Sequence, residues 1–211
     1  VAHAGDSLTI GYTARVVASG TDSVVGFMVD APANARVELP GPRAAWLVMN
    51  RYKARPVASW SSLRTFWGNG QSTPELSVTA RGMLGIVGYW AERNAVPDSE
   101  ITDIPPKARA SMDSVVDIVG ASGSTIGIVP LPADLSAGAQ ASRLVALIDQ
   151  SCSLGWIDSP GICTSLKAKA KAESGPLGAL LNELNAQRGK HVNESAYLLL
   201  AHNATRLLSQ L

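Results

Sequence analysis

Two tryptophans stand close together in the first half of the sequence, where their rings could meet a ligand. Trp60 and Trp67 bracket the segment 61–66. An exposed pair of indoles would stack on sugar rings or anchor a protein interface, because each combines a broad apolar face with a polar N–H. The alternative, which the pattern favours, is that both indoles fill the core near a corner of a β-sheet.

A row of basic residues precedes these tryptophans. Arg51, Lys53 and Arg55 alternate along the chain, so on a single strand all three side chains would share one face. Such a row could meet a phosphate, an anionic sugar or an acidic partner. The favoured alternative is a solvated outer face, or positive charge that protects an edge strand from unwanted pairing.

The sequence contains two cysteines, Cys152 and Cys163, on either side of a predicted helix–helix turn. A helical hairpin can bring the two Cα atoms to the roughly 5.5 Å that a disulfide needs. Closing a loop of about a dozen residues would stabilise the fold by roughly 3 kcal/mol. A disulfide would indicate a periplasmic or extracellular protein. Two buried free thiols are the alternative.

Catalytic signatures are absent from the sequence. It contains no His-Glu-x-x-His zinc helix, no Gly-x-Ser-x-Gly elbow and no phosphate-binding loop. Glu100, Asp103, Asp113 and Asp117 come nearest to an acidic cluster, but their spacing fits no calcium loop. We therefore expect no catalytic residues, no metal ligands and no cofactor.

The overall charge bounds the class of partner. The chain has 18 Lys and Arg against 17 Asp and Glu, a formal net charge of +1. This balance argues against broad electrostatic binding to nucleic acid. No apolar run approaches the roughly 20 residues that span a bilayer. Ala2-His3-Ala4 has the small-x-small form of a signal-peptidase site, although a chance match in an Ala-rich chain explains it equally well.

The first half of the chain has the alternating pattern of strands that bury one face. We expect about seven short strands and an all-β, immunoglobulin-like sandwich over residues 1–95. The expected strands cover 7–16, 24–29, 35–39, 45–49, 51–59, 75–80 and 85–90.

Residues 96–135 are expected to connect two domains and to add a strand or a helix, since 107–119 fits either. Within them, 120–124 is Gly- and Ser-rich and predicts a flexible break, and 125–132 predicts extended chain. From 136 to 211 the period becomes helical, and four short helices predict a small all-α four-helix bundle. Ser136, Ser159 and Asn193 are the expected N-caps.

This helical end resembles the FIMAH domain of secreted bacterial proteins over roughly residues 133–211. The resemblance implies a C-terminal helical appendage of an extracellular protein, without catalytic residues. One departure concerns the second helix. In similar sequences this helix runs longer and a Gly-containing turn precedes the third helix, whereas the segment up to 171–175 is too short for both. The β part resembles the domain that often precedes such a bundle, through segments 73–76, 80–82, 89–90 and 123–127. The segments that carry the FIMAH likeness are 144–148, 155–157, 165–169, 180–192, 196–199 and 207–208.

Together these features predict a non-catalytic, extracytoplasmic interaction protein. We expect a structural or accessory subunit that docks onto protein partners, including a membrane complex on its extracytoplasmic face. The first alternative is a carbohydrate-binding module that uses Trp60 and Trp67. The second is a hydrolase whose pocket would join acids between Glu100 and Asp117 to the strands.

Overall fold

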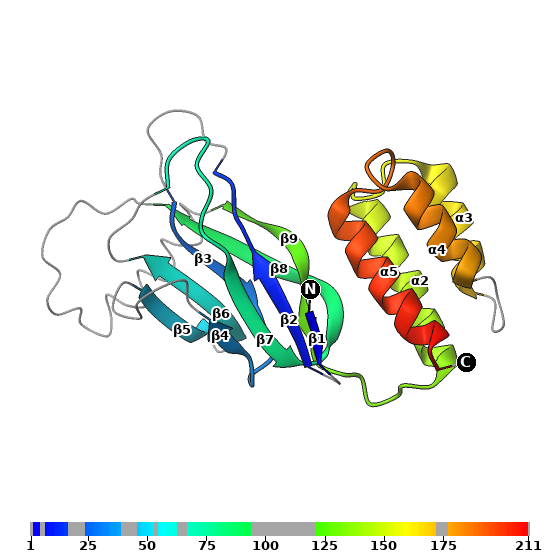
Figure 1. Cartoon of the computed structure of the whole chain (residues 1–211), viewed down its shortest axis with the longest axis horizontal. Coiled ribbons are helices and arrows are strands. Elements are labelled where there is room, and N and C mark those ends of the chain that lie inside the picture. Colours follow the sequence, from blue (N-terminus) through cyan, green and yellow to red (C-terminus); the bar gives the residue numbers. More distant parts are fainter. Residues whose placement is uncertain are drawn as a thin grey trace, which may run out of the picture. The chain divides into compact units, whose positions relative to one another are not determined.

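The chain forms two compact units in a computed structural model (Figure 1). The first unit comprises Val1–Gly82 and Val87–Ile128, and the second comprises Met83–Ile86 and Val129–Leu211. The structure describes residues 2–4, 7–16, 24–38, 46–52, 55–62, 67–93, 121–171 and 177–210. Strands make up the first unit, and helices dominate the second.

One sheet of the first unit has four strands in the order β1-β2-β7-β4. Each neighbouring pair is antiparallel, and β2 lies opposite β7 over its whole length, from Ser7 opposite Arg81 to Tyr12 opposite Leu76. The bounds are β1 Ala2–Ala4, β2 Ser7–Tyr12, β4 Arg36–Glu38 and β7 Leu76–Arg81.

The other sheet has five strands in the order β5-β6-β3-β8-β9. Phe27 lies opposite Trp60 on one neighbouring strand and opposite Ala91 on the other, which fixes the register of the centre. The bounds are β3 Val24–Asp30, β5 Trp46–Tyr52, β6 Arg55–Ser62, β8 Met83–Arg93 and β9 Ala121–Val129.

The two sheets face each other across an aromatic core. Leu8, Ile10 and Tyr12 on β2 are buried, as the alternation of that strand predicts. The Tyr12 ring lies 6.1 Å from Phe27 and 6.2 Å from Trp60, centroid to centroid, and its hydroxyl donates to the Ile126 carbonyl at 3.1 Å. Burial raises the pKa of Tyr12, because its anion would lose hydration.

Glycines on β9 make room for large neighbours on β8. A Cβ on Gly123 would collide with the Tyr89 ring, and one on Gly127 would collide with Val87. The order of these opposed pairs is reversed along the two strands, so β9 runs antiparallel to β8. The side chains of β8 therefore fill the space that larger residues on β9 would need.

The four helices of the second unit begin and end at sequence signals. Ser136 and Asn193 accept hydrogen bonds from first-turn amides, at 3.4 Å from Ala139 N and 2.9 Å from Ala196 N. Gly155 and Gly189 follow helices with positive φ angles of 69° and 71°, which favour glycine. The helices are α2 Ala137–Ser153, α3 Pro160–Lys171, α4 Leu177–Gln187 and α5 Glu194–Leu208.

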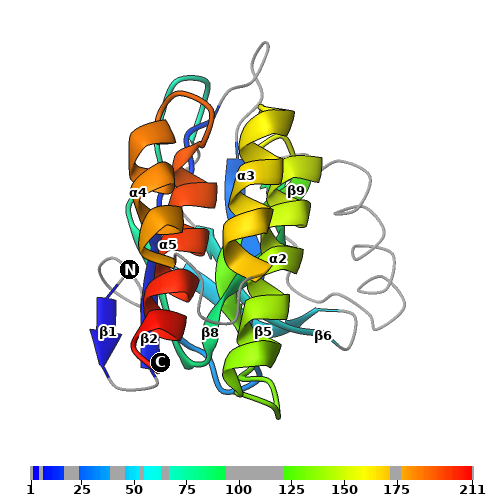
Figure 2. The same ribbon diagram turned by 90° about the vertical axis from the view of Figure 1, so that its right-hand side faces the viewer.

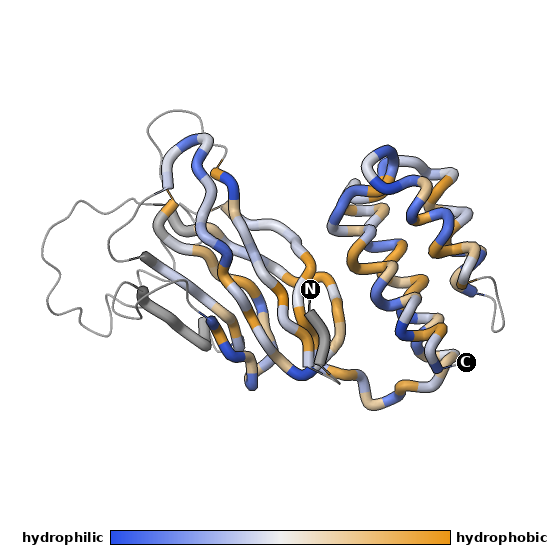
Figure 3. Tube along the Cα trace, in the orientation of Figure 1, coloured by the Kyte–Doolittle hydropathy of each residue, from blue (hydrophilic) through white to orange (hydrophobic). Residues whose placement is uncertain are grey.

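Each helix contacts two others: α2 contacts α3 and α5, and α4 contacts α3 and α5 (Figure 2). Apolar and hydrophilic positions alternate along the helices at helical spacing (Figure 3). At one end, Ile157 and Val192 form an isolated β-bridge that joins the α2–α3 loop to the α4–α5 turn. Leucines dominate the buried positions: Leu144, Leu147, Leu166, Leu177, Leu180, Leu184, Leu199, Leu200 and Leu207.

The predicted succession of a β-rich part and four helices agrees with the structure, with three differences. β1 occupies Ala2–Ala4, where no strand was predicted. The flexible break predicted at 120–124 is wrong, because these residues open β9 from Ala121 onward. The single strand predicted over 51–59 is also wrong, because the chain reverses between Tyr52 and Arg55, which pair with each other.

Candidate functional site

The two tryptophans are buried, as the favoured interpretation of the sequence predicts, and the alternative of an exposed platform is not present. Trp60 is 0% exposed and Trp67 is 7% exposed, so the interpretation of the two indoles as an exposed pair is wrong. Trp60 packs among Tyr12 and Phe27 between the two sheets. The physical reason is position: Trp60 points inward on a central strand, where a large apolar ring is worth most when it is removed from water.

The basic residues that were predicted to share one face of a single strand do not lie on one strand. Arg51 is the last residue but one of β5 and Arg55 begins β6, so the two lie on different, paired strands, and Lys53 lies outside the described residues. The Arg55 guanidinium lies 4.7 Å above the centre of the Trp90 ring and 4.0 Å from the Asp30 carboxylate. Arg55 is therefore a partnered surface residue rather than one member of an anion-binding strip.

The two cysteines form a disulfide. Cys152 near the end of α2 and Cys163 in α3 are bonded, with their Cα atoms 6.3 Å apart. The helical hairpin predicted from the break between two helical patterns brings the cysteines together. The bond lies within the helical unit.

The remaining acidic and histidine side chains considered as reactive groups are either paired or outside the described residues. The four acids between Glu100 and Asp117 lie outside it. His191 Nδ1 lies 2.7 Å from an Asp158 carboxylate oxygen on the surface. Within the described residues, no three His, Cys, Asp or Glu side chains gather as they would around a metal, and no helix is long and apolar enough to cross a bilayer.

One polar cluster was not anticipated. Lys169 Nζ lies 2.7 Å from Ser165 Oγ and 2.6 Å from Glu183 Oε2, and Ser165 donates to the same carboxylate oxygen at 2.9 Å. A serine beside a lysine resembles a nucleophile with its base, but here both side chains also contact the Glu183 carboxylate. The cluster therefore joins α3 to α4 through a closed set of polar contacts.

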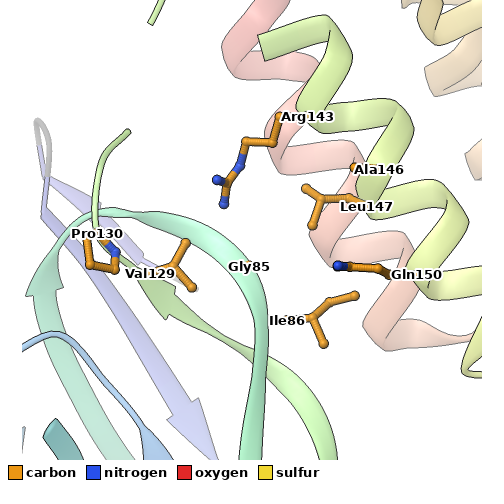
Figure 4. A pocket seen from close by; sticks show the side chains of 8 residues that line it. All are labelled: Gly85, Ile86, Val129, Pro130, Arg143, Ala146, Leu147 and Gln150. Carbon is orange, nitrogen blue, oxygen red and sulfur yellow. The ribbon is translucent and has the colours of Figure 1, made fainter. Parts of the chain in front are cut away.

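A cavity of about 270 Å³ lies in the second unit (Figure 4). One wall is a face of α2, and the other comes from two extended segments of the same unit. Pro130, Ala146 and Gln150 are exposed, so the cavity has access to solvent. Its lining consists of Gly85, Ile86, Val129, Pro130, Arg143, Ala146, Leu147 and Gln150.

Arg143 supplies the charge of this cavity. Its side chain extends from α2 toward the segment that carries Val129 and Pro130 (Figure 4). The Nε atom is buried and has no hydrogen-bond partner among the described residues. Burial lowers the pKa of Arg143, because the guanidinium is less well solvated, although an arginine stays charged at neutral pH.

The sequence carried a faint signal of this site. Arg143, Ala146, Leu147 and Gln150 recur at positions i, i+3, i+4 and i+7, and so they share one face of α2. A polar residue at each end of an otherwise apolar helical stripe departs from simple amphipathicity. The strand side could not be found in this way, because Gly85 and Ile86 lie far from α2 in the chain.

Comparisons with known proteins leave the chain without an assigned family. No known family and no curated protein matches it. Among solved structures, it has some likeness to an uncharacterized protein from Nocardia farcinica that is described as having an immunoglobulin-like fold. The likeness has 15% identity and a TM-score of 0.32, covering 47% of this chain and 81% of the other. A TM-score this low carries no argument about this protein.

Proposed function

We propose that the protein is a non-catalytic, extracytoplasmic interaction protein, an accessory subunit that docks onto a larger periplasmic, membrane-peripheral or cell-surface assembly. In this proposal the β unit is an immunoglobulin-like sandwich, the helices form a four-helix bundle like that of FIMAH domains, and the sandwich provides the docking edge. The partner adds an extended segment to the five-stranded sheet.

The observation that carries the proposal is the character of β9. It lies at the end of its sheet, with β8 as its neighbour among the described strands. Ala121, Ser122 and Gly123 are exposed, and Ala121–Val129 contains no charged residue and no proline. Natural edge strands usually carry such residues to prevent pairing. An edge without them is suited to receive a strand through main-chain hydrogen bonds.

The disulfide supports the proposed extracytoplasmic location. Cys152–Cys163 would not persist in a reducing cytoplasm, whereas structural disulfides are common in exported proteins. The assignment is tested by trapping thiols with a maleimide in intact source cells before lysis. Oxidised cysteines in the native protein support export, and two alkylated cysteines would refute it.

Docking is tested with a photo-crosslinking residue placed at Ser122 in the source organism. The matched control places it at Thr13, which is also exposed in the first unit. We expect a discrete adduct with one envelope or secreted protein from Ser122 and none from Thr13. Ser122→Lys should abolish co-purification of that protein, because a lysine on an edge opposes pairing, whereas Thr13→Lys should not.

Two results would overturn the proposal. The first is a protein that stays monomeric in every native fraction and forms no adduct from Ser122. The second is an adduct whose partner still co-purifies with the Ser122→Lys variant as well as with the wild type.

A further inference from the structure

The cavity of the second unit has the build of a small-molecule site, and this inference does not depend on the proposed docking. Ligand sites are mostly apolar with a few placed polar groups. Here Ile86, Val129 and Leu147 provide apolar walls, and Arg143 and Gln150 provide the polar groups. The two polar groups lie seven residues apart, so about 10 Å of helix separates them.

No carboxylate in the described part of the second unit pairs with Arg143. Every described carboxylate of the second unit is engaged elsewhere. Asp149 pairs with Lys167, Asp158 with His191, Glu183 with Lys169 and Glu194 with Arg188, while Asp134 accepts from the Ser136 amide. A buried guanidinium N–H without an acceptor is costly, and most native structures avoid it. Because Arg143 also lines the cavity, an anion that enters the cavity would supply the missing acceptor.

The chemical class of the anion follows from the single positive charge of Arg143 and the apolar walls of the cavity. One guanidinium neutralises one negative charge and meets a carboxylate through two parallel hydrogen bonds. A phosphate dianion would bring a second charge beside apolar walls with no cation to balance it. A monocarboxylate with an apolar body satisfies both parts of the cavity.

The volume of the cavity limits the size of the ligand. Since one water molecule takes about 30 Å³ in the liquid, 270 Å³ holds roughly nine non-hydrogen atoms. We propose that this cavity binds a small monocarboxylate with an apolar aliphatic or aromatic body, its carboxylate on Arg143 and its far end near Gln150. Octanoate, with about ten non-hydrogen atoms, is a suitable probe.

Binding is measured by titration calorimetry and ligand-observed NMR on the full chain with octanoate. For ten atoms at the efficiency of small ligands, Kd is expected on the order of 0.1–1 mM. Arg143→Gln should weaken binding about 10- to 100-fold, the range for a lost charge-assisted pair. The matched control is Arg206→Gln, because Arg206 also has a buried Nε without a partner but does not line the cavity. It should change Kd less than about 2-fold.

Two further measurements keep the test decisive if a variant is unstable. Octanamide, a neutral molecule of the same shape, should bind the wild type at least about 10-fold more weakly, because its carbonyl accepts a hydrogen bond from the guanidinium but carries no charge. Ala146→Phe keeps Arg143 but fills the cavity, and it should also abolish octanoate binding. The proposal is overturned if octanoate does not saturate the wild type by about 10 mM. Equal binding of octanamide, or unchanged binding by Arg143→Gln, would overturn it as well.

Discussion

Removal of the disulfide should lower the stability of the helical unit by an amount that the chain itself predicts. Cys152 and Cys163 are 11 residues apart, so the bond closes a loop of about a dozen residues. In the chain-entropy account, opening such a loop releases about 3 kcal/mol of unfolded-state entropy at 25 °C. A unit of this size loses about 4–8 °C in Tm per kcal/mol. The expected drop is therefore roughly 12–24 °C.

The assay compares three samples by far-ultraviolet circular dichroism, which follows the helices. They are the oxidised wild type, the wild type with reductant, and the double variant Cys152→Ser/Cys163→Ala. The reduced wild type and the double variant should melt together, well below the oxidised protein, and reductant should not affect the variant. If the double variant melts within about 3 °C of the oxidised wild type, the loop-closure reasoning is refuted.

Three other substitutions test local features. Asn193→Ala removes the N-cap of α5 and should cost about 1 kcal/mol in urea unfolding, whereas Asn193→Asp should cost little; equal losses would contradict the capping role. Lys169→Met leaves Glu183 without its cation and should lower the free energy of unfolding by about 1–3 kcal/mol. Glu183→Leu added to Lys169→Met should recover part of that loss. If the effects of the two substitutions simply add, the two side chains do not interact. Gly127→Ala should destabilise the sandwich by about 1–3 kcal/mol through collision with Val87, and Val87→Ala should relieve it; no loss would show that the strands shift freely.

Local signals in the sequence predicted the helical unit closely. Ser136 and Asn193 are N-caps, and Gly155 ends a helix region with positive φ, because these roles depend on a few neighbouring residues. The disulfide followed from the same local hairpin. The spacing of the cysteines was informative because the helix boundaries around them were right.

Longer-range features were predicted less well. The Gly- and Ser-rich start of β9 indicated a break, but its glycines are required by Tyr89 and Val87 on the neighbouring strand. The turn after Tyr52 lacks an Asn-Gly or Asp-Gly signal, so the reversal that separates Arg51 from Arg55 was missed. The cavity joins α2 to residues about 60 positions earlier in the chain, and no local pattern reports such a pairing.

The four helices associate as two hairpins whose contacts do not require an intact chain between them. The disulfide joins α2 to α3, and α5 follows α4 after a tight turn, so the unit consists of two helical hairpins. The hairpins meet along two seams, α3 with α4 and α2 with α5. Neither seam depends on the peptide link between α3 and α4. We therefore expect the two hairpins to stay associated after cleavage of the chain at that link.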